Sequence, residues 1–89
     1  MSTILVTPTI APYEGGFALR ITSTDDAARA WWKWYDQEMY AFIEAVQLGL
    51  ATEEVIGAER HSVTVRKTLK TQVSINPEQL ERFAFKAAL

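Results

Sequence analysis

The hydrophobic positions near the start of the chain recur every second residue, which is the period of a strand. Residues 3–7 are rich in β-branched side chains, and Phe17, Leu19 and Ile21 alternate with small or polar residues up to position 22. This alternation is typical of a strand with one buried face. The intervening 14–16 segment, Glu-Gly-Gly, favours a turn. The pattern therefore predicts two antiparallel strands that form a hairpin with a long loop.

The period then changes to that of a helix. The segment 23–26, Ser-Thr-Asp-Asp, is typical of a helix N-terminus, where such side chains accept hydrogen bonds from free N–H groups. Apolar residues follow at helical spacing as far as Leu48, and Gly49 suits the left-handed residue that ends a helix. We therefore expect one long helix to about Leu48. Its main apolar face would collect Ala28, Trp31, Trp32, Tyr35, Met39, Phe42, Ile43 and Val46.

A second apolar flank runs along this predicted helix and consists of small residues around one indole. Small residues let another helix approach closely, and a spacing of seven keeps such a seam aligned. We interpret this flank as a candidate protein interface. The alternative is that the C-terminal helix covers it within one chain. The residues of the predicted seam are Ala27, Trp34, Glu38, Ala41, Ala45 and Leu48.

Three further elements are predicted in the C-terminal part. Residues 52–56 fit a short turn of helix. From Val63 to Ile75 the apolar residues keep odd positions and no Gly or Pro marks a turn, which favours one long strand, bent near Lys67, over two short ones. Asn76 followed by Pro77 is a strong helix start, because Asn caps the free N–H groups and Pro suits the first helical position.

These elements predict a single α+β domain over residues 1–89, with an antiparallel sheet of about three strands packed on one long central helix. The order is β-β-α-(short α)-β-α. A chain of 89 residues has room for one core, and its 48% hydrophobic residues and ten aromatic side chains can fill it.

Location is inferred from three features that the chain lacks. Cysteine is absent, so there is no sign of an oxidising compartment. No apolar run reaches the ~18 residues of a membrane span, and the N-terminus lacks the basic region of a signal peptide. We expect a cytoplasmic protein.

Charge is distributed unevenly along the chain. Residues 1–59 carry nine acids and three bases, whereas residues 60–89 carry six bases and two acids. The two parts therefore differ in sign, although the whole chain has a net charge of only −2. Such polarity can steer association with a partner. It also raises nucleic-acid binding as the alternative function, through a basic strand that carries Arg60, Arg66, Lys67 and Lys70.

No catalytic or cofactor motif is recognisable. The single His61 cannot form a multi-histidine metal site, and the four glycines form neither a phosphate loop nor a dinucleotide fingerprint. We therefore expect no enzyme activity, no metal and no cofactor. A weaker alternative is a small-molecule pocket or weak active site beneath the long helix, with Tyr13, Tyr35 or Glu38.

A protein-binding module is the class that remains. The expected partner is a second copy, giving a homodimer, or the surface of another protein. Compact accessory proteins that act by covering a partner, such as inhibitors encoded by phages and mobile elements, have a similar size and lack catalytic residues. This is an analogy of class, since fold does not establish function.

Overall fold

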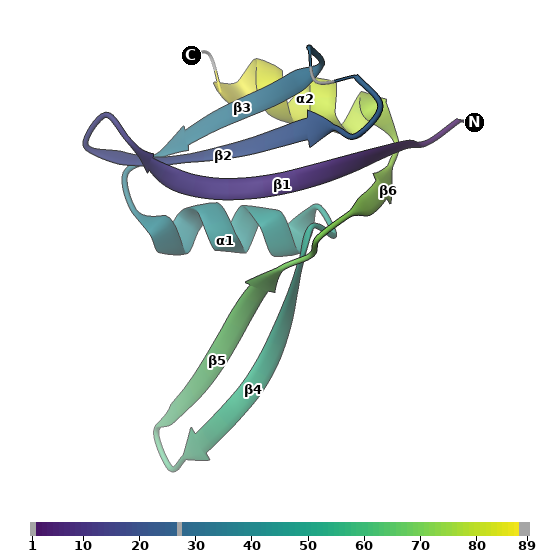
Figure 1. Cartoon of the computed structure of the whole chain (residues 1–89). Helices are drawn as coiled ribbons and strands as arrows, with labels where there is room; N and C mark the ends of the chain where they lie inside the picture. Colours follow the sequence, from purple (N-terminus) through teal and green to yellow (C-terminus); the bar gives the residue numbers. More distant parts are fainter. Residues whose placement is uncertain (1, 27, 88–89) are drawn as a thin grey trace.

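The computed structural model describes residues 2–26 and 28–87, and shows six strands and two helices in that part of the chain (Figure 1). The strands belong to a four-stranded antiparallel sheet with the order β3-β2-β1-β6 and to a separate two-stranded hairpin, β4-β5. The elements are β1 (Ile4–Tyr13), β2 (Gly16–Ser23), β3 (Ala30–Tyr35), α1 (Glu38–Gln47), β4 (Ala51–Glu59), β5 (Ser62–Leu69), β6 (Val73–Ile75) and α2 (Pro77–Ala87).

The predicted N-terminal hairpin is present, but its strands are longer and its loop is shorter than expected. Strands β1 and β2 pair along their length up to Tyr13 opposite Gly16. Only Glu14 and Gly15 connect them, and both have positive φ, at 45° and 77°. A two-residue turn with positive φ at both positions matches the twist of antiparallel strands, which is why it joins them tightly.

The prediction of one long helix from residue 23 to residue 48 is wrong, because its first half contains strand β3. The Ser23 side chain accepts a hydrogen bond from the Asp26 N–H at 3.3 Å, and Asp26 Oδ1 accepts from the Ala28 N–H at 3.0 Å. The residues expected to cap a helix therefore stabilise the loop between β2 and β3. The aromatic side chains after it suit a strand as well as a helix, and pairing with β2 selects the strand.

Helix α1 is the remaining second half of the predicted helix, and its end is as expected. Gly49 has a φ of 78°. The Leu50 N–H donates to the Ala45 carbonyl at 2.8 Å and the Gly49 N–H donates to the Val46 carbonyl at 3.1 Å. These two bonds form the Schellman arrangement that satisfies the last carbonyls of a helix.

Both helices pack on one face of the four-stranded sheet. Lys33, which shares this face with its register partner Leu19, contacts Glu44 of α1 and the ring of Phe83 of α2. We call the opposite face, which carries Ala18, Arg20 and their register partners, the outer face. The buried core beneath the helices comprises Val6, Leu19, Ile21, Trp31, Ala41, Ala45, Leu50, Ala51, Ile75, Leu80 and Phe83.

Two C-terminal predictions are corrected and one is confirmed. Residues 52–56 lie in strand β4, and the expected single strand over 62–75 is two strands in different sheets, β5 and β6. The break falls where Leu69 packs against the core and the Lys70 N–H donates to the Leu50 carbonyl at 2.9 Å. Helix α2 begins as predicted, since Asn76 Oδ1 accepts from the Glu78 N–H at 2.9 Å.

The fold is therefore α+β, with antiparallel sheets, two helices and mostly strands. It differs from the expected arrangement because the main sheet has four strands and its central helix α1 has only ten residues. In the described part of the chain, neither helix has the length and apolar character that crossing a membrane requires.

Candidate functional site

The predicted interface seam does not exist as one surface. Trp34 lies on strand β3, whereas Ala41 and Ala45 lie on α1, where both are fully buried in the core. Glu38 is exposed at the start of α1, and Leu48 packs against the core after its end. Ala27 lies outside the described residues. The structure therefore does not bring the residues of the predicted seam together, because the heptad spacing joined residues of a strand to residues of a helix.

Trp34 nevertheless reaches the surface, on the outer face of the sheet. Its side chain remains 38% exposed, and its indole N–H donates to the Tyr13 carbonyl at 3.0 Å. The ring lies over Gly16, where an added Cβ would stand only 2.6 Å from it and would also collide with the Tyr35 carbonyl. The absence of a side chain at position 16 thus creates the space in which Trp34 lies.

Two further aromatic rings flank a hollow on the outer face. The Tyr13 and Trp32 ring centroids are 5.9 Å apart and the rings are tilted by 51°. The Arg20 guanidinium lies 4.9 Å from the Trp32 ring centroid, a favourable cation–π contact. This hollow has a volume of about 180 Å³ and is lined by Thr9, Ala11, Pro12, Tyr13, Ala18, Arg20 and Trp32.

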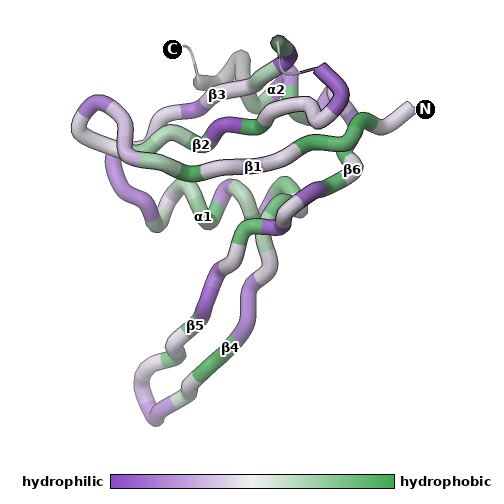
Figure 2. The backbone as a smooth tube through the Cα atoms, in the orientation of Figure 1, coloured by the Kyte–Doolittle hydropathy of each residue, from purple (hydrophilic) through white to green (hydrophobic). Residues whose placement is uncertain are grey.

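The hairpin of β4 and β5, residues 51–69, is a second prominent surface, and we call it the arm. It projects from the body at the C-terminal end of α1 (Figure 1). Figure 2 shows hydrophobic stretches along it, away from the body. Val55 and Val63 are both 61% exposed, and Ile56, which a register shift leaves without a partner in β5, is 48% exposed.

One face of the arm continues the apolar surface of the core. The register places Ala51 opposite Leu69, Val55 opposite Val65 and Ala58 opposite Val63. The first pair packs in the core beneath α1, while the other two pairs extend away from it, beyond the Glu53–Lys67 ion pair that lies on the same face. On α1, Met39 and Ile43 are 53% and 37% exposed. The arm and this side of α1 therefore expose apolar residues that no described part of the chain covers.

The basic residues predicted to contact nucleic acid are spread over the arm and its flank. Arg66 and Lys67 lie on β5 opposite Glu54 and Glu53, and Lys67 Nζ is 3.7 Å from Glu53 Oε1. Arg60 is in the turn at the tip, beside His61, and Lys70 follows β5 at the base. Acids from the first part of the sequence, on β4, thus lie opposite bases from the second part, on β5. Two of the four predicted cations, Arg66 and Lys67, therefore face carboxylates.

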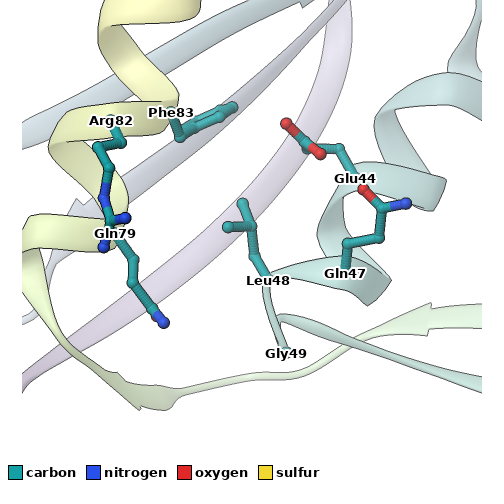
Figure 3. Close-up of a pocket in the computed structure, with 7 residues that line it drawn as sticks. All are labelled: Glu44, Gln47, Leu48, Gly49, Gln79, Arg82 and Phe83. Carbon is teal, nitrogen blue, oxygen red and sulfur yellow. The ribbon is translucent and has the colours of Figure 1, made fainter.

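A cleft of about 480 Å³ separates the end of α1 from α2 (Figure 3). Leu48 and Phe83 form its apolar wall, with polar side chains of both helices around them. The Glu44 carboxylate at its rim accepts a hydrogen bond from Lys33 Nζ at 3.0 Å. The described residues that line the cleft include no Ser, Lys, His or Cys.

Tyr35 lies beside Glu44, which lines this cleft, and its hydroxyl is buried. Burial, and secondarily the nearby Glu44 carboxylate, raise the pKa of Tyr35 well above its usual value. The buried hydroxyl makes no hydrogen bond of normal geometry within the described residues. A raised pKa keeps the phenol neutral, which makes it a poor base.

The residues of the alternative small-molecule site are not brought together. Tyr13 and Tyr35 lie on opposite faces of the sheet, because their register partners Gly16 and Phe17 are neighbours on β2. Glu38 is exposed at the first turn of α1. In the part of the chain that the structure describes, no cluster of three or more His, Cys, Asp or Glu side chains is arranged to hold a metal ion.

Sequence reasoning missed the two surfaces that the structure reveals. A signal for the outer face was present, because Gly16, Ala18 and Arg20 share one parity of β2 and leave room for aromatic rings. The turn of the arm gave little sequence signal, because Arg60 and His61 are not typical turn residues. Neither residue has positive φ in the structure.

The comparisons with known proteins add no family to this description. The chain matches no family model, and neither the curated proteins nor the solved structures contain a significant match to it.

Proposed function

We propose that this chain is a non-enzymatic protein-binding module that associates with a second copy of itself through the arm. The observation that carries the proposal is the apolar face of the arm, with Val55 and Val63 both 61% exposed. A two-stranded hairpin is only marginally stable by itself, and grouped exposed apolar residues commonly mark a partner surface. Covering this face would stabilise the hairpin and remove apolar surface from water.

The distribution of charge on the arm favours a second copy as the occupant. Strand β4 carries Glu53, Glu54 and Glu59 and no base, whereas β5 carries Arg66 and Lys67 and no acid. If two arms pack through the face that carries Val55 and Val63, about a two-fold axis along their length, Glu53 of each arm lies over Lys67 of the other. Glu54, Glu59 and Arg66 point to the opposite face. Pairing through equivalent edges instead would bring β4 against β4 or β5 against β5, with like charges together.

The surface area that a stable dimer must bury indicates how much of each copy belongs to the interface. A strand rises about 3.3 Å per residue, so the arm offers a face of roughly 250 Å². Two arm faces alone would bury about 500 Å², less than the ~1,200 Å² of a standard interface. Helix α1, whose Met39 and Ile43 are also exposed, offers further apolar area. We therefore include it in the interface.

Self-association is tested by measuring the mass in solution for the unaltered chain and for Val63→Lys. The unaltered chain should form a dimer at ~100 μM, and the variant should shift towards the monomer, because a charge replaces an apolar side chain at the interface. Thr64→Lys is the matched control, since the neighbouring residue on β5 points to the other face and should leave the dimer intact.

A strict monomer of the unaltered chain at ~100 μM would contradict self-association. Equal loss of the dimer in both variants would contradict the assignment of the apolar face. The nucleic-acid alternative is examined in the same preparation with single- and double-stranded DNA and RNA at ~50 mM salt, where phosphate contacts are strongest. Tight binding that is lost in Arg60→Gln and Lys70→Gln would favour that alternative.

A further inference from the structure

The hollow on the outer face is a built aromatic site rather than a general exposed patch. Its two rings, Tyr13 and Trp32, stand 5.9 Å apart at 51° over the buried Ala18, which forms the floor between them. Pro12 adds a rigid apolar rim. At this distance the two rings contact each other, and together with Ala18 and Pro12 they form an apolar surface of the hollow against which a small side chain can pack.

The hydrogen-bonding groups of this hollow are available to a ligand. The Trp34 indole N–H is already used by the Tyr13 carbonyl. By contrast, no described residue forms a hydrogen bond with the Trp32 indole N–H or the Tyr13 hydroxyl. Both groups donate, so they are suited to a ligand that presents carbonyl oxygens. An extended polyproline segment does this, because its backbone has no internal hydrogen bonds and its carbonyls point outwards.

The charges around the hollow limit its occupant further. Arg20 is the one charged residue that lines it, and no acid does. Acids lie beyond both ends of this face, with Glu14 in the β1-β2 turn and Asp25 and Asp26 after β2. A chain of phosphates would meet these carboxylates, whereas a single carboxylate beside Arg20 would not. The charge pattern therefore fits a largely neutral ligand with one acidic group at its centre.

We infer that the outer face binds an extended, proline-rich peptide segment that carries an acidic side chain. A proline ring packs in the hollow against the Tyr13 and Trp32 rings, the Trp32 indole N–H and the Tyr13 hydroxyl donate to peptide carbonyls, and Arg20 pairs with the carboxylate. Aromatic-lined grooves recognise such segments because the polyproline conformation is formed before binding and loses little entropy. This inference goes beyond self-association, since the hollow and the arm lie on opposite sides of the sheet.

The test follows the tryptophan indole N–H signals of the ¹⁵N-labelled full chain by NMR. The probe is an acetylated, amidated peptide of four prolines, one aspartate and four prolines, titrated to ~2 mM, which detects weak binding. The Trp32 signal, assigned with Trp32→Phe, should shift in a saturable way. Replacing the aspartate of the peptide by lysine should weaken binding about tenfold, because the pair with Arg20 is lost.

Two variants and two further probes complete the test. Trp32→Ala should abolish binding, while Thr22→Ala, on the same face but outside the hollow, should bind as the unaltered chain does. A peptide of glycine and serine around the same aspartate should not bind. Val63→Lys should retain peptide binding whether or not the chain dimerises, so the two proposals fail independently.

Each contrary outcome has a definite meaning. An unmoved Trp32 signal at ~2 mM peptide overturns the inference, as does equal binding of the glycine-serine peptide. Tighter binding of an oligothymidylate of ~12 nucleotides than of the peptide also overturns it, and assigns the hollow to base stacking instead.

Discussion

Gly16 and Trp34 illustrate at the scale of single residues how an absent side chain positions a large one. The Trp34 ring covers Gly16, and a Cβ at this position would meet the ring at 2.6 Å. The ring then donates its N–H to the Tyr13 carbonyl and so connects β3 to the end of β1. The position of Trp34 at the surface thus depends on a residue that is distant in the sequence and adjacent in the sheet.

Gly16→Ala should therefore destabilise the fold by about 1–3 kcal/mol, the usual range for overpacking a close contact. The free energy of unfolding by urea measures the effect. Gly57→Ala is the matched control, because its Cβ would meet nothing closer than Thr64 at 3.8 Å. The control should change stability by less than ~0.5 kcal/mol. Equal effects of the two substitutions would show that Trp34 does not depend on the space over Gly16.

At the scale of elements, strand β3 shows why a pattern of bulky residues is ambiguous. With a period of 3.6, Trp31 and Trp32 fit the main apolar face of a helix and Trp34 fits its second flank. In the strand they separate by parity, with Trp31 in the core at 8% exposure and the other two on the outer face. Neighbouring side chains of a strand point to opposite faces, so adjacent tryptophans have different roles.

This separation predicts different costs for neighbouring substitutions. Trp31→Ala should lower the free energy of unfolding by ~3–5 kcal/mol, as is usual for a core aromatic residue. Trp32→Ala should cost less than half as much, because its ring lies on the outer face of the sheet, against Tyr13 and Arg20. Chemical denaturation of both variants measures the difference. Similar losses would contradict the assignment of the two rings to opposite faces.

At the scale of the whole molecule, the two proposed surfaces lie on different sides of the sheet. The helices and the arm are on the core side, and the aromatic hollow is on the other. A dimer formed through the arms therefore leaves two hollows free. Two linked sites that bind the same kind of segment gain affinity through effective concentration. Such a dimer would hold two of the proposed segments at once.

Hydrogen exchange should reveal the dimer as concentration-dependent protection of the arm. At ~1 μM the amides of β4 and β5 should exchange much faster than those of β1 and β2, because few buried contacts hold the arm. At ~200 μM they should become protected, since mass action favours the dimer. The amides of β1 and β2 serve as the internal control and should not change. Unchanged exchange of the arm over this range would argue against its burial.

Much of the local structure was predictable because it depends on residues close in sequence. The β1-β2 hairpin, the end of α1 at Gly49 and the start of α2 at Asn76 all have local chemical causes: positive φ at a turn, a left-handed residue after a helix, and a side chain that caps free N–H groups. The long helix was predicted wrongly because Ser23 and Asp26 make the same kind of hydrogen bond in a loop as at a helix start.

The sequence by itself determined the α+β class, the amount of apolar surface to be buried and the absence of a recognisable catalytic motif, since these depend on composition, period and local hydrogen bonding. The tertiary structure alone decided which tryptophans are buried and that the acids of β4 meet the bases of β5. It also decided that Tyr13 and Trp32 flank one hollow. The physical reason is that strand pairing brings together residues that are distant in the chain. The aromatic residues of β3 are compatible with a helix or a strand, and pairing with β2 selects the strand.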